Sequence, residues 1–148
     1  MSSNSTLFDR VGGYPTVKKV HKIFYDKIYA DSWIGQFFKE VKQEVIEDQQ
    51  TDFMVHAMGG PDKYNGAFPV SAHRHMNITI ELFEYRHEML KQSLKEAGLS
   101  TDLIESWLKI DGAFKKGIVK KNISDCTRRF ATDEIVDHPQ PSSIKKVA

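Results

Sequence analysis

The feature that most limits the fold is a helical spacing of apolar residues, cut into segments by glycine and proline. From Thr16 onward, apolar residues recur three and four positions apart and predict an amphipathic helix that ends near residues 30–32. A compact aromatic corner follows at 33–38. A second helix is expected from Lys42 to Met58, because Gly59-Gly60-Pro61 then prevents its continuation.

Two further helices are expected in the second half of the chain. Thr79 is a suitable N-cap for a helix over 80–97, which Gly98 ends. A fourth helix is expected over 101–118, with Gly112 as a weak point in its interior. No segment alternates with a period of two, and no hairpin turn separates two β-branched runs, so the sequence predicts an all-α protein.

The 148 residues are enough for one domain with a real core, which we expect at 7–122. Residues 1–6 are polar and are predicted to form a flexible tail. Residues 123–148 are interpreted as a polar, partly disordered C-terminal extension, with one short helix near Phe130–Val136.

Composition narrows the class of protein. The formal net charge is +1, so no strong field favours nucleic acid or a membrane surface as a partner. Cys126 is the only cysteine, which rules out a disulfide within the chain and suits a reducing compartment. The N-terminus has no apolar signal region and no run is long enough to span a membrane, so we expect a cytoplasmic protein.

Three side chains are candidates for binding chemistry. His73 follows a turn-rich connection at 61–70 and lies among apolar neighbours, where it could ligate a metal, although a lone histidine is more often structural. Tyr25 and Gln50 fall on the core faces of two helices and need hydrogen-bond partners once buried. A bound ligand with a polar atom would supply these partners. Alternatively, both side chains lie at the rim of the core, where solvent supplies the partners.

The order and spacing of several short motifs resemble the truncated haemoglobins, and within them group I, the N type. The resemblance covers about residues 7–120 and implies a shortened globin, a two-over-two helical sandwich in which a loop replaces most of the F helix. The motifs are Leu7-Phe8-Asp9-Arg10-Val11-Gly12-Gly13, Phe24-Tyr25-Asp26-Lys27-Ile28, Ala30-Asp31, Phe37-Phe38, Gln49-Gln50-Thr51-Asp52-Phe53, Gly59-Gly60-Pro61, Tyr64-Asn65-Gly66 and Ala72-His73-Arg74-His75-Met76-Asn77-Ile78-Thr79.

The resemblance also implies the main residues of a site for haem b (iron protoporphyrin IX). His73 matches the proximal histidine that ligates the haem iron, and His75 is the one serious rival. Tyr25 matches the distal tyrosine that donates a hydrogen bond to bound dioxygen, and Gln50 matches the glutamine that supports it. Ile46 cannot ligate iron, which predicts an open or water-bound distal side.

The remaining site residues are implied more loosely. Phe38 matches the aromatic residue that packs on the haem face, while Lys42 and Arg74 are candidates to meet the propionates. A covalent link from His87 or His21 to a haem vinyl group stays open. Candidate pocket residues, which ordinary core packing would explain equally well, are Phe53, Met54, Met76, Ile78, Phe83, Leu90 and Ile110.

The resemblance implies reversible binding of dioxygen, carbon monoxide and nitric oxide, with oxygen transport as a candidate role. Retention of oxygen is favoured over rapid delivery, which argues against bulk storage. Oxidation of nitric oxide to nitrate is a candidate activity, and it would require an unidentified external reductase because the chain has no G-x-G-x-x-G motif. A monomer or weak dimer is expected. A haem-based gas sensor and a haem-free helical binding module remain the alternatives.

Overall fold

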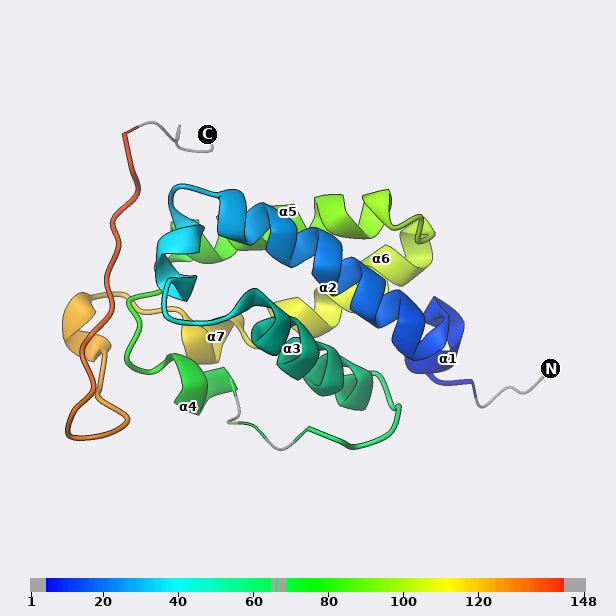
Figure 1. Ribbon diagram of the computed structural model, residues 1–148, viewed down its shortest axis with the longest axis horizontal. Helices are drawn as coiled ribbons and strands as arrows, with labels where there is room; N and C mark the ends of the chain where they lie inside the picture. The colour runs from blue at the N-terminus through cyan, green and yellow to red at the C-terminus, as the bar shows by residue number, and fades with distance from the viewer. Residues whose placement is uncertain (1–4, 65, 67–68, 143–148) are drawn as a thin grey trace.

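The computed structural model describes residues 5–64, 66 and 69–142 (Figure 1). Four long helices form two pairs: α2 (Gly13–Ala30) packs on α3 (Gln43–Ala57), and α5 (Ile80–Glu96) packs on α6 (Thr101–Gly112). Contacts between α2 and α5 join the two pairs. None of the helices in this part of the chain is long and apolar enough to cross a membrane.

The helix ends are fixed by local chemistry. The hydroxyl of Thr79 accepts a hydrogen bond from the amide of Leu82 at 3.1 Å, which caps the start of α5 as predicted. Gly59 follows the end of α3 with φ of +90°, a left-handed conformation that favours glycine. A helix of five residues, α1 (Leu7–Val11), precedes α2.

Shorter elements connect these helices. The aromatic corner is the 3-10 helix η1 (Ile34–Phe38). The fourth helix was expected to run on to residue 118, but it breaks after the predicted weak point Gly112 and resumes as α7 (Lys115–Ile118). Proline begins α4 (Pro69–His73), so the end of the expected turn-rich connection is helical. Residues 65, 67 and 68 of that connection lie outside the described residues.

The core lies between the helix pairs and includes a buried polar contact between α2 and α3. Nδ1 of His21 lies 2.8 Å from the hydroxyl of Thr51, so a hydrogen bond joins α2 to α3. Burial, followed by the charge of Arg86, lowers the pKa of His21 to about 3, so its ring is neutral at pH 7. Fully buried core side chains are Val17, Val20, Phe24, Ile28, Met54, Leu90, Leu94 and Trp107.

Helix α3 turns a partly polar face toward the core. Its apolar residue Val45 is 47% exposed. Thr51 and Glu47 are buried instead, because His21 pairs with the threonine and Gln43 donates to the Glu47 carboxylate at 2.8 Å. These partners satisfy polar groups that would otherwise disfavour burial.

The predicted helix near Phe130–Val136 is wrong. After the 3-10 helix η2 (Ile123–Asp125), the described chain is irregular and extended, and Val136 forms an isolated parallel bridge with Met76. The amide of Val136 donates to the carbonyl oxygen of His75, and its own carbonyl accepts from Asn77, both at 2.8 Å. Backbone groups bonded in this way to another segment are not available for a helix.

Candidate functional site

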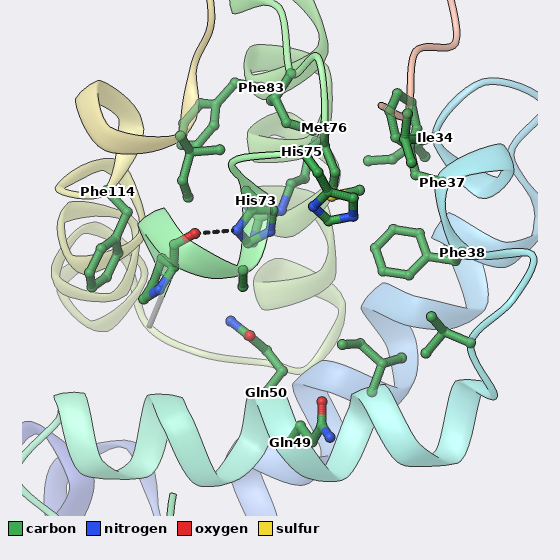
Figure 2. A pocket seen from close by; sticks show the side chains of 18 of the residues that line it. Ile34, Phe37, Phe38, Gln49, Gln50, His73, His75, Met76, Phe83 and Phe114 are labelled. Carbon is green, nitrogen blue, oxygen red and sulfur yellow. Dashed lines mark hydrogen bonds between the residues drawn. The ribbon is translucent and has the colours of Figure 1, made fainter. Parts of the chain in front are cut away.

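A cavity of about 580 Å³ lies among α3, α4, α5 and η1. This volume falls within the range of roughly 300–1,000 Å³ typical of cofactor pockets. Its walls are mainly apolar, and Figure 2 shows several of the side chains that face it. The apolar lining includes Ile34, Phe37, Phe38, Ile46, Phe53, Met54, Ile78, Phe83, Phe114 and Ile118.

One ring nitrogen of His73, Nε2, is available to bind a metal. Its Nδ1 lies 2.7 Å from the carbonyl oxygen of Pro69, one turn earlier in α4 (dashed in Figure 2). Because a carbonyl oxygen only accepts, Nδ1 carries the proton and Nε2 keeps its lone pair. Burial lowers the pKa of His73 to about 4, despite the opposing effect of the Pro69 carbonyl, so the ring is neutral at pH 7. These are the properties of a histidine that ligates a metal.

Polar groups come to the cavity from the facing helices. Tyr25 of α2 is 4% exposed, and its ring meets that of Phe38 at 5.9 Å. Burial raises the pKa of the Tyr25 hydroxyl above its usual range, so the hydroxyl remains a donor at neutral pH. Gln49 and Gln50 of α3 lie across the cavity from His73 (Figure 2).

His75 also lines the cavity and is only 7% exposed. Within the described residues its Nδ1 has no hydrogen-bond partner. A buried polar atom in this state is destabilising unless a bound group satisfies it. His75 is therefore the histidine that must be tested against His73.

Arg86 and Asp111 of the cavity wall belong to a charged cluster that was not predicted from the sequence. Nη1 of Arg86 and Nδ1 of His87 both donate to one carboxylate oxygen of Asp111, at 2.9 and 2.8 Å. Burial alone would raise the pKa of Asp111, but Arg86 and His87 hold it well below its usual range. The sequence could have indicated this cluster, because its charged residues interrupt the apolar faces of their helices.

Most of the predicted site residues share this cavity. Four of them do not line it: Leu90 is buried in the core, Ile110 packs against the core, Lys42 is exposed, and Arg74 donates to the carbonyl of Arg129. The rings of His21 and His87 do not line it either, because they bond to Thr51 and Asp111. Predicted residues that do line it are Tyr25, Phe38, Ile46, Gln50, Phe53, Met54, His73, Met76, Ile78 and Phe83.

The C-terminal extension supplies further lining residues that were not predicted. Arg129, Asp133, Glu134 and Val136 all face the cavity. The sequence over 129–136 has no periodic pattern that could have placed these side chains in the cavity wall.

Known proteins similar to this chain share both its sequence pattern and its fold. Residues 6–119 match the family described as Bacterial-like globin. The Group 1 truncated hemoglobin of Tetrahymena pyriformis is 31% identical over 121 residues, which are 82% of this chain and 100% of that protein. The Group 1 truncated hemoglobin GlbN of Synechocystis is 33% identical over 113 residues, 74% of this chain and 91% of that protein.

Solved structures agree with this assignment. The truncated hemoglobin of Tetrahymena pyriformis in its Fe(III) form has a TM-score of 0.74 at 32% identity, covering 79% of this chain and 100% of that one. The 2/2 hemoglobin of Synechococcus, in the cyanomet state with covalently attached heme, has a TM-score of 0.71 at 28% identity, covering 78% and 98%. The chain therefore belongs to the bacterial-like globin family: it is a group I truncated haemoglobin with a two-over-two helical fold, and membership of this family implies gas binding through haem.

Proposed function

We propose that His73 is the axial ligand of haem b and that the opposite side of the haem binds dioxygen, carbon monoxide and nitric oxide reversibly. The observation that carries this proposal is the hydrogen bond from Nδ1 of His73 to the Pro69 carbonyl, at 2.7 Å. It fixes the orientation of the ring and leaves an unprotonated Nε2 for the iron.

The residues of the cavity fit a haem with an open distal side. Bound haem supplies an iron centre that coordinates a diatomic gas. Tyr25 holds a hydroxyl proton in an apolar wall, and Gln50 adds an amide from the facing helix. The Ile46 side chain offers no nitrogen or oxygen, so it could not ligate the iron of a haem held in this cavity.

The direct test of haem and gas binding is the absorption spectrum of the purified protein with added hemin. We expect a Soret band in the ferric form, and a shift of this band when carbon monoxide is added after dithionite reduction. A spectrum without haem bands would contradict the proposal and support a haem-free helical binding module.

A nitric oxide dioxygenase-type activity is the second candidate function. The donors Tyr25 and Gln50 favour retention of dioxygen, and retention suits oxidation of nitric oxide to nitrate better than delivery of oxygen. Turnover requires an external reductase. With a reductant supplied, we expect nitrate to form catalytically. Gas binding without nitrate formation would leave a binding protein or gas sensor.

A further inference from the structure

The C-terminal strap, defined as residues 126–138, is bonded to the segment that follows His73. The amide of Thr127 donates to the carbonyl of Arg74, and the amide of Val136 donates to the carbonyl of His75, both at 2.8 Å. The amide of Asn77 returns a bond of 2.8 Å to the carbonyl of Val136. The backbone of the strap is therefore attached at both ends of the segment 74–77.

Side chains attach the far end of the strap to the aromatic corner. The indole nitrogen of Trp33 donates to the carbonyl of His138 at 2.8 Å, and the His138 ring meets the Phe37 ring edge-on at 4.8 Å. The side-chain amide Nδ2 of Asn77 donates to the carboxylate of Asp137 at 3.0 Å. The strap, orange to red in Figure 1, thus joins the segment after α4 to η1.

The strap also contributes to the cavity itself. Val136 and Glu134 line the cavity, as do Arg129 and Asp133, which form an ion pair with contacts of 2.9 and 3.0 Å. The strap is bonded to the carbonyl oxygen of His75, a residue that also lines the cavity. The match to the globin family ends at residue 119, so this wall lies outside the region that the family defines.

We infer that the C-terminal strap is a wall of the haem site and slows the loss of bound haem. This inference rests on the proposed function, because it requires haem in the cavity. A group that leaves past the strap must first break the hydrogen bonds to segment 74–77 and to Trp33. Each such bond contributes modestly to stability, so weakening one should speed haem loss by about 3- to 10-fold.

The test is the rate at which the ferric holoprotein transfers hemin to excess apomyoglobin. Trp33→Phe removes the donor to His138 while keeping an aromatic ring. Trp107→Phe is the matched control, because Trp107 is buried, does not line the cavity and has an indole nitrogen without a partner in the described structure. We expect faster hemin loss in Trp33→Phe and a wild-type rate in Trp107→Phe.

A backbone substitution tests the strap independently. Val136→Pro removes the amide that bonds to His75, whereas Val136→Ala keeps it. The inference predicts that the proline variant loses hemin several-fold faster than the alanine variant. Equal rates for the two tryptophan variants overturn it, even if Val136→Pro fails to fold. Failure of the wild-type protein to take up hemin would instead contradict the proposed function.

Discussion

Tyr25 is a buried hydroxyl that remains protonated, because burial raises its pKa. If it donates to bound dioxygen, Tyr25→Phe removes a hydrogen bond to a partly charged acceptor, worth about 1.5–3 kcal/mol. Since each 1.4 kcal/mol corresponds to a factor of ten, we expect dioxygen to dissociate roughly 10- to 100-fold faster. Stopped-flow displacement of dioxygen by carbon monoxide measures this rate.

Tyr29→Phe is the matched control for this substitution. The Tyr29 hydroxyl donates to the carbonyl of Val41 at 2.7 Å and does not line the cavity. Its removal should leave the dissociation rate unchanged. A wild-type rate in Tyr25→Phe would show that the tyrosine is not the distal donor.

Single residues were predictable where a local motif surrounds them. His73 was singled out by the order and spacing of the motifs that resemble the truncated haemoglobins, and it lies in the cavity wall. Arg86 and Asp111 could not be paired from sequence, because their contact joins two helices across 25 positions. Charges on apolar faces indicate that partners exist, but only the packing of α5 on α6 identifies them.

Lys120 holds the end of the short helix that carries His73. Its Nζ donates to the carbonyls of His73, Met76 and Ile118, at 3.0, 3.2 and 2.9 Å. Lys120→Met should lower the stability of the apoprotein by about 1–3 kcal/mol, because three carbonyls in part-buried hydrogen bonds lose their donor. It should also speed amide exchange in residues 69–76, measured by mass spectrometry.

Lys121→Met is the control at the adjacent position, where the side chain is exposed. It should leave both stability and amide exchange near wild type. If the two methionine variants behave alike, Lys120 has no part in holding α4.

The long helices were predictable because periodicity and capping residues act locally. The ends of α3 and α5 fall within one residue of the predicted ends. Helix α4 and the strap depend on distant partners instead. Lys120 donates to the carbonyl at the end of α4, and backbone groups of segment 74–77 bond to the strap. Because these partners are distant in sequence, local patterns predicted a turn where α4 begins and a helix where the strap is extended.

Stability of the whole molecule should depend on pH through His21. Burial lowers its folded pKa to about 3 from the usual 6.5. Between these values the unfolded state binds a proton that the folded state does not, so stability present above pH 6.5 falls as the pH is lowered. One such group lowers the free energy of unfolding by about 1.4 kcal/mol for each pH unit below 6.5. Urea unfolding at pH 6.5 and 5.0 measures this decrease.

His21→Gln keeps a polar side chain opposite Thr51 but has no titrating ring. This variant should be less stable at every pH, and its stability should decline less steeply between pH 6.5 and 5.0. An unchanged slope would show that His21 is not the group that takes up the proton.

Ligation by His73 is the central claim, and the ferrous spectrum tests it most directly. We would compare the wild type with His73→Gly and His75→Ala, each with and without added imidazole. We predict five-coordinate ferrous spectra for the wild type and His75→Ala. His73→Gly should lose this spectrum and regain it when imidazole fills the vacated position. Loss of the spectrum in His75→Ala, with His73→Gly unaffected, would contradict the assignment.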